Sequence, residues 1–161
     1  MRVSAVVLAA GKSSRMGANK LLLKLGDKTV IEHILDSLAG YETVVVTGHS
    51  PEEMKGIVAR YGVKTVHNPD YEKGMTTSFQ TGLRTIDSDA TFVVLGDTFG
   101  FSEALLKRME DEMVGHTGAL LVSPVHKGRR GHPVLVRSPL FKEFLNLRPW
   151  ETMRDVVDRH E

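Results

Sequence analysis

Residues 3–11 read Val-Ser-Ala-Val-Val-Leu-Ala-Ala-Gly, an apolar run that ends in small residues. A short run of this kind, rich in β-branched residues and bounded by glycine, is typical of a buried β-strand. A signal peptide is a poorer interpretation, because only Arg2 supplies charge before the run and a polar loop follows it directly. We therefore expect the chain to begin with a buried strand that leads into a loop.

Further along the chain, short apolar runs alternate with segments of helical periodicity. We expect further strands at residues 43–47, 64–67, 91–95, 119–122 and 134–137. Helices are expected over residues 30–38, from Pro51, over 75–86, from Ser102 to Val114, and in most of the tail after Pro139.

This alternation predicts the fold class. Strands that alternate with helices form mostly parallel sheets with helices on both faces. The last two strands are joined by a turn-rich stretch at residues 127–133, which predicts an antiparallel edge. With no repeat or internal linker, residues 1–161 are expected to form one α/β domain of Rossmann-like type.

The composition excludes several classes of partner and of catalytic site. A net charge of +1 gives no strong attraction to nucleic acid or to an anionic membrane, so neither is expected as a partner. The chain contains no cysteine, which excludes disulfides, thiolate catalysis and cysteine-bound metals. No apolar run approaches the roughly 20 residues that span a bilayer. We expect a cytoplasmic protein.

The loop after the first strand carries phosphate-binding chemistry. Small residues from Ala9 to Gly11 let backbone amides approach phosphate oxygens, and the next residues add hydroxyl and cationic side chains. The glycine spacing fits neither a Walker A loop nor G-x-G-x-x-G. On composition alone, a solvated basic surface loop is an equally good interpretation.

The order of residues in this loop favours phosphate binding over a solvated surface loop. Residues 8–20 resemble the L-A-A-G-x-S-x-R-M-G-x-x-K motif of nucleotidyltransferases related to the molybdenum cofactor guanylyl- and cytidylyltransferases. Three further motifs of that family follow in order, at residues 68–83, at Leu95-Gly96-Asp97 and at residues 128–134. The resemblance extends from residue 1 to about 140. It implies the nucleotide-diphospho-sugar transferase fold and the transfer of a nucleoside monophosphate from an NTP to a phosphorylated acceptor.

The resemblance also implies roles for individual residues. Arg15, Lys20 and Asp97 would be the catalytic residues, with Asp97 as the ligand of Mg²⁺. The acceptor side would contain Gly131 and His132. The nucleotide side would contain Leu8, Ala9, Ala10, Gly11, Lys12, Ser13, Arg15, Lys20, Asn68 and Ser78.

The resemblance indicates the substrates less directly than it indicates the reaction. Ala9-Ala10 is similar to the cytidylyl branch, whereas the guanylyl branch tends to have L-A-G-G, so CTP is favoured over GTP. Molybdopterin is the first candidate for the acceptor, and a sugar phosphate or another small phosphorylated alcohol is the alternative. A nucleotide-binding protein with weak or no catalysis is a second alternative.

The chain departs from the family in two places: the first changes the turn beneath the acceptor pocket, and the second, a shorter C-terminus, supports the alternative of a binding protein. The family usually has a proline within two residues of the L-G-D aspartate, and this chain has Thr98-Phe99-Gly100 instead. Relatives also continue beyond the segment that ends here at Glu161 and supply a second acidic metal ligand there, so the domain is expected to be short at its C-terminus. Asp155 and Asp158 lie in a helical pattern beside arginines, and we expect them on a solvated face rather than at the metal.

Overall fold

A six-stranded sheet runs through the molecule in the computed structural model, which describes residues 1–11, 20–49, 51–96 and 100–160. The strand order is β5-β4-β1-β6-β10-β7, and the strands are β1 (Val3–Ala9), β4 (Glu42–Thr47), β5 (Lys64–His67), β6 (Ala90–Leu95), β7 (Leu121–Val122) and β10 (Val134–Arg137). β1 pairs in parallel with β4 and β6, and β4 pairs in parallel with β5. β10 is antiparallel to both β6 and β7, which confirms the predicted antiparallel edge.

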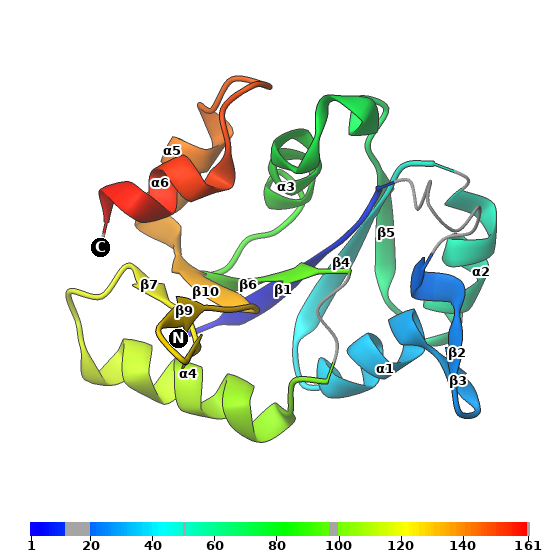
Figure 1. Ribbon diagram of the computed structural model, residues 1–161, viewed down its shortest axis with the longest axis horizontal. Coiled ribbons are helices and arrows are strands. Elements are labelled where there is room, and N and C mark those ends of the chain that lie inside the picture. Colours follow the sequence, from blue (N-terminus) through cyan, green and yellow to red (C-terminus); the bar gives the residue numbers. More distant parts are fainter. Residues whose placement is uncertain (12–19, 50, 97–99, 161) are drawn as a thin grey trace.

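Helices cover both faces of this sheet (Figure 1). One face carries α1 (Val30–Ser37), α2 (Pro51–Arg60) and α4 (Glu103–Gly115), and the other carries α3 (Met75–Leu83), α5 (Phe141–Leu145) and α6 (Met153–Arg159). Short 3₁₀ turns are η1 (Lys20–Leu22), η2 (Tyr71–Lys73) and η3 (Ser138–Leu140). In the parts of the chain that the structure describes, no helix is long and apolar enough to cross a membrane.

The alternation of side chains along β1 creates two cores, one on each face. Ala5 and Val7 pack with the buried stripe of α1 and with α2 and α4. Val6 and Leu8 point the opposite way and pack with α3, α5 and α6. Successive side chains of a strand point to opposite faces, so an almost wholly apolar strand is what a two-sided core requires.

The chain departs from the predicted elements mainly in short segments. α3 ends at Leu83 rather than at residue 86. Just beyond this end, the Thr85 hydroxyl donates to the Gly82 carbonyl at 2.7 Å, and this bond competes with helical hydrogen bonding. Two hairpins were not predicted: β2 (Lys24–Leu25) with β3 (Lys28–Thr29), and β8 (Val125–His126) with β9 (Arg129–Arg130). Strands of two residues leave no hydrophobic period to detect.

The packing of α3 on the sheet generates a testable prediction. A Cβ at Gly82 would lie 2.5 Å from Val6 Cγ1 and 3.0 Å from Val46 Cγ2, so Gly82→Ala overpacks the interface between α3 and the sheet. We expect a loss of about 1–3 kcal/mol in the free energy of unfolding, measured by urea denaturation. The control is Gly56→Ala in α2, where a Cβ meets nothing within 4 Å and alanine should add about 0.5–1 kcal/mol. An equal gain at both positions would contradict this account of the interface.

Candidate functional site

The carboxyl ends of the parallel strands meet at one edge of the sheet, where open α/β sheets bind their ligands. Leu8 near the end of β1 is in register with Leu95 at the end of β6, and Ala9 is in register with Thr47 at the end of β4. Ala10 and Gly11 follow directly, so the backbone that should hold the triphosphate starts between two neighbouring strand ends.

Two glycines allow this close approach. A Cβ at Gly96 would lie 3.0 Å from the Leu8 carbonyl oxygen and 2.9 Å from Leu21 Cδ1. A Cβ at Gly48 would lie 2.6 Å from the Ala10 carbonyl oxygen and equally close to Tyr71 Cβ. Any larger residue at either position would push into the backbone that enters the loop. Gly48 was not among the predicted site residues, because its only signal in the sequence is a glycine that ends a strand.

Four predicted site residues, Lys12, Ser13, Arg15 and Asp97, lie outside the described residues. Of the remaining nucleotide-side residues, Leu8, Ala9 and Ala10 are buried at the end of β1, and Gly11 and Lys20 are exposed. Gly96, which directly precedes Asp97, packs against the Leu8 carbonyl. Among the described residues, no group of three or more His, Asp or Glu side chains could hold a metal ion.

The structure brings Asn68 and Ser78 together. Asn68 follows β5 and is only 2% exposed, and its Nδ2 donates to Ser78 Oγ at 2.9 Å and to Thr77 Oγ1 at 3.0 Å. Its Oδ1 accepts the backbone amide of Asp70 at 3.0 Å. The side chain therefore ties the end of β5 to the first turn of α3, and its two N–H donors are both used inside the protein.

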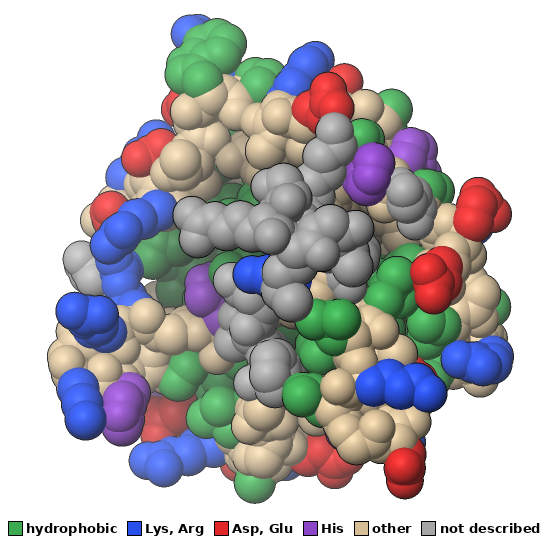
Figure 2. All heavy atoms as spheres, turned by 45° about the vertical axis from the view of Figure 1, so that its right-hand side comes forward, with side chains coloured by type: hydrophobic (Ala, Val, Ile, Leu, Met, Phe, Trp, Pro, Cys, Tyr) green, Lys and Arg blue, Asp and Glu red, His purple; other side chains and the backbone are tan. Residues whose placement is uncertain are grey.

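Gly131 and His132 line a cavity of about 630 Å³ beside the strand ends. The turn that carries them is fixed by the Gly131 amide, which donates to the Pro124 carbonyl at 2.8 Å. Leu95 and Val134 bring two strands of the sheet to the cavity, whose other walls come from residues 73–76 and from residues 149–154 and 157. Figure 2 shows basic side chains gathered along one side of this face, beside a hollow with a hydrophobic floor.

Acidic residues of α6 have structural partners. Asp155 Oδ2 accepts the Thr152 amide at 2.8 Å, and this backbone bond together with the Thr152 hydroxyl holds the pKa of Asp155 below its ordinary value. The cap therefore contributes to the stability of the folded protein at neutral pH, and this contribution is lost as the pH falls through the lowered pKa of Asp155. Asp158 pairs with Arg130 at 2.7 Å and joins α6 to the β8–β9 hairpin. Both side chains are exposed, which confirms the expectation of a solvated face.

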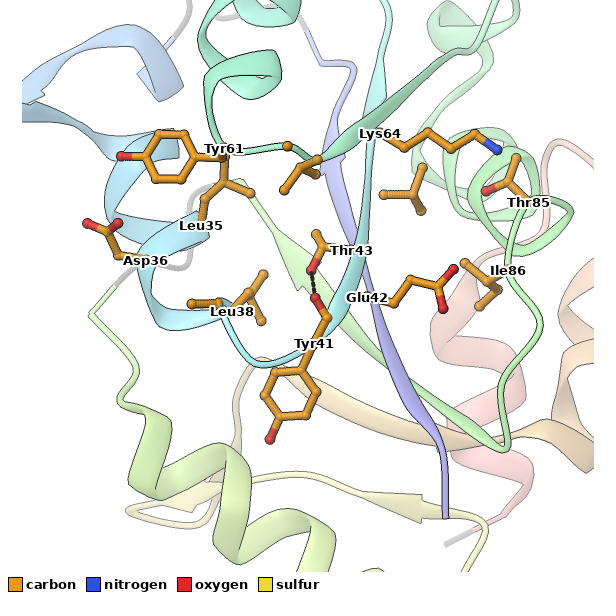
Figure 3. Close-up of a pocket in the computed structure, with 14 residues that line it drawn as sticks. Leu35, Asp36, Leu38, Tyr41, Glu42, Thr43, Tyr61, Lys64, Thr85 and Ile86 are labelled. Carbon is orange, nitrogen blue, oxygen red and sulfur yellow. Dashed lines mark hydrogen bonds between the residues drawn. The ribbon is translucent and has the colours of Figure 1, made fainter.

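A second cavity, of about 400 Å³, lies at the opposite end of the parallel strands. Figure 3 shows Tyr61 and Asp36 on one side of it and Glu42, Lys64 and Thr85 on the other. Tyr61 donates to Glu32 at 3.2 Å, and Tyr41 donates to Glu110. Burial and this bond raise the pKa of Tyr41, so its phenol stays protonated. These hydroxyls are engaged within the fold, and ligand-binding chemistry is better placed at the carboxyl ends.

Comparison with known proteins identifies the family. Residues 5–161 match the MobA-like NTP transferase domain. The chain belongs to this family. Members are nucleotidyltransferases, so the enzyme class expected from the loop and the L-G-D motif is confirmed.

Individual relatives agree with the MobA-like assignment. The chain is 26% identical to the molybdenum cofactor cytidylyltransferase of Escherichia coli K12 over 158 residues, which cover 96% of this chain and 80% of that protein. It is 33% identical over 112 residues to a probable molybdenum cofactor guanylyltransferase of Natranaerobius thermophilus, covering 69% of this chain and 55% of that protein.

A solved structure confirms the fold. The crystal structure of Rv0371c from Mycobacterium tuberculosis superposes with a TM-score of 0.85 at 26% identity, covering 99% of this chain and 84% of that chain. The same protein in complex with manganese superposes with a TM-score of 0.82 at 25% identity, covering 100% and 85%.

The Asn68 network of this MobA-like domain yields a second prediction. Asn68→Ala removes the partner of the Ser78 hydroxyl and of the Asp70 amide, whereas the Thr77 hydroxyl keeps its bond to the Gly74 carbonyl at 2.8 Å. We expect a loss of about 1–3 kcal/mol in the free energy of unfolding by urea denaturation, the cost of buried polar groups left unsatisfied. His67→Ala, at the exposed neighbouring position in β5, is the control and should change stability by less than about 0.5 kcal/mol. Equal stability of the two variants would show that the network does not hold the end of β5.

Proposed function

We propose that this domain transfers CMP from CTP to a small phosphorylated acceptor and releases pyrophosphate, with Mg²⁺ as cofactor. The observation that carries the proposal is the juxtaposition at the carboxyl ends of the strands. The end of β1, which begins the expected triphosphate loop, lies in register beside Leu95, which lines the 630 Å³ cavity. A triphosphate at the loop and an acceptor in the cavity would therefore meet at the ends of β1 and β6.

The triphosphate would bind the loop after β1. Backbone amides from Leu8 to Gly11 with Lys12 and Ser13 would meet phosphate oxygens, and Arg15 would bind them with two parallel hydrogen bonds. Lys20, exposed at the start of η1, would neutralise charge at the reacting phosphate. Asn68 and Ser78 would serve the nucleotide side by fixing the turn between β5 and α3.

The donor set fits Mg²⁺. Gly96, at the end of β6, lies close to the Leu8 carbonyl, where the expected triphosphate loop begins. Asp97 is the next residue in the sequence. One carboxylate together with triphosphate oxygens forms the all-oxygen ligand set that Mg²⁺ prefers. When bound, the ion would neutralise the charge that develops on the phosphates.

The walls of the cavity favour a ring-bearing acceptor. Its apolar lining includes Met75, Val134, Trp150 and Met153, which suits a flat heterocycle better than a polyhydroxylated sugar. The cations that line it are Lys73, Arg130 and Arg154, and they suit a phosphate group. A molybdopterin, which combines a fused ring system with a phosphate, meets both requirements. Gly131 and His132 would then face the acceptor.

The reaction needs no dedicated base. The acceptor phosphate is already anionic near neutral pH, and its oxygen attacks the α-phosphorus of CTP in line while the bond to pyrophosphate breaks. The domain contributes by placing the two substrates and by neutralising charge through Arg15 and Lys20. A Ser-His-Asp or similar constellation has no task in this mechanism.

The main experiment measures pyrophosphate release from CTP and GTP in the presence of candidate acceptors. We expect release that depends on both an NTP and the acceptor, with CTP giving the higher kcat/KM, because Ala10 stands where guanylyl relatives tend to have glycine. A preference for GTP would overturn the cytidylyl assignment alone. Nucleotide binding without release, with every acceptor tested, would instead indicate a binding protein.

The role of Asp97 gives a further prediction. Asp97→Asn keeps the size of the side chain and removes its charge, so Mg²⁺-dependent turnover should fall at least 100-fold, the order expected when about 2.7 kcal/mol or more of transition-state stabilisation is lost. Turnover is measured against Mg²⁺ concentration, with circular dichroism as a check on folding. Asp111→Asn on the exposed side of α4 is the matched control and should remain fully active. A fully active Asp97→Asn enzyme would place the metal on another residue.

A further inference from the structure

We infer that Trp150 is a specificity-determining residue of this enzyme, the aromatic surface on which the ring of the acceptor stacks. The inference rests on the proposed function and goes beyond it, because it assigns acceptor selection to one side chain outside the family motifs. It begins from an unusual exposure. Trp150 is the only tryptophan of the chain, it is 73% exposed, and it lines the 630 Å³ cavity.

Met75, which comes from a different element of the fold, is exposed at the same cavity. It is the first residue of α3, it is 54% exposed, and it lines the same cavity. Large apolar side chains that are exposed together around one cavity mark a binding surface more often than a solvated one. A flat ring that contacts both the thioether and the indole would lose much of its contact with water.

The helix α3 fixes the backbone that carries the indole. Trp150 lies in the connection between α5 and α6, and two buried side chains of α3 bind that connection on either side of it. Gln80 Nε2 donates to the Leu147 carbonyl at 2.7 Å and to the Phe144 carbonyl at 2.9 Å. Thr76 Oγ1 donates to the Glu151 carbonyl at 2.7 Å. The backbone that carries Trp150 is thus fixed at both ends before any ligand binds, which lowers the entropic cost of stacking.

A cation also supports the indole. The Arg148 guanidinium lies 5.5 Å from the centre of the Trp150 ring, a distance typical of a cation–π contact. Despite this contact the ring retains most of its exposure, so it still presents a surface to the cavity. Arg148 does not line the cavity, and its position suits support of the indole rather than contact with the acceptor.

The charges around the cavity identify the other end of the ligand. Arg154 and Lys73 line it, and so does Arg130, which Asp158 fixes at 2.7 Å. Glu151 also lines it, and this residue is held at the turn by the Arg148 amide, which donates to its carboxylate at 3.1 Å. An indole and a thioether beside three cations match a planar heterocycle that carries a phosphomonoester.

The test measures binding by calorimetry with three probes: a pterin that carries a phosphomonoester, glucose 1-phosphate, and CTP. Trp150→Ala should weaken binding of the pterin phosphate about 5- to 150-fold, the range for loss of one stacking contact. Trp150→Phe keeps an aromatic face and should stay within about threefold of the unmodified protein. CTP should bind all three proteins equally. Val114→Ala, at another exposed apolar position on α4, is the control for a general surface effect.

Positioning by α3 is tested separately. Thr76→Val removes the bond to the Glu151 carbonyl, so it should weaken binding of the pterin phosphate and leave CTP binding unchanged. Thr76→Ser keeps the hydroxyl and should bind the pterin phosphate as the unmodified protein does. Thr81→Val, which removes a bond inside α3 at 2.8 Å, is the matched control. Circular dichroism confirms that each variant is folded.

Two results would overturn the inference. The first is an unchanged affinity of Trp150→Ala for the pterin phosphate. The second is tighter binding of glucose 1-phosphate than of the pterin phosphate by the unmodified protein. Pyrophosphate release with glucose 1-phosphate in that second case would leave the proposed nucleotidyl transfer intact, whereas absence of release with every acceptor would count against the proposed function itself.

Discussion

The burial of β1 on all sides is the constraint on which the rest of the structure depends. β1 pairs with β4 along one edge and with β6 along the other, and its side chains enter both cores. A strand buried in this way requires a pairing strand on each edge to satisfy its backbone N–H and C=O groups, and here both neighbours run parallel to it and end at the same level. That requirement brings the ends of β4 and β6 beside the start of the loop, and Gly48 and Gly96 make the approach sterically possible.

A single helix, α3, connects the proposed nucleotide side with the proposed acceptor side. Its first turn receives the hydrogen bonds of Asn68, its middle binds the connection that carries Trp150, and Gly82 near its end packs onto Val6 of β1. The same helix therefore fixes the end of β5, the wall of the cavity and the distance to the sheet. A displacement of α3 would therefore alter both proposed substrate sites at once, and the buried polar side chains of α3, among them Gln80 and Ser78, form the bonds that hold it.

The two sides of the proposed site differ in chemistry, as do the two ligands proposed for them. The loop after β1 combines small residues with cations and hydroxyls, which suits a polyphosphate that needs backbone donors and charge neutralisation. The cavity beside it combines methionine and tryptophan side chains with a few cations at its rim. A mostly apolar lining with few polar groups is typical of sites that select a small molecule by shape.

The sequence by itself determined the six strands of the main sheet, most helix boundaries, the antiparallel edge and the family motifs, because these depend on local periodicity and on residues that are adjacent in the chain. Through the family resemblance it also assigned Asn68, Ser78, Gly131 and His132 to the expected site. Only the tertiary structure decided that Asn68 and Ser78 bond to each other, that Gly48 borders the loop, that Asp158 pairs with Arg130, and that Trp150 lines the cavity. The physical reason is that each of these contacts joins residues on different elements, and the distance between such residues is set by the packing of helices on the sheet, for which a single sequence carries no local signal.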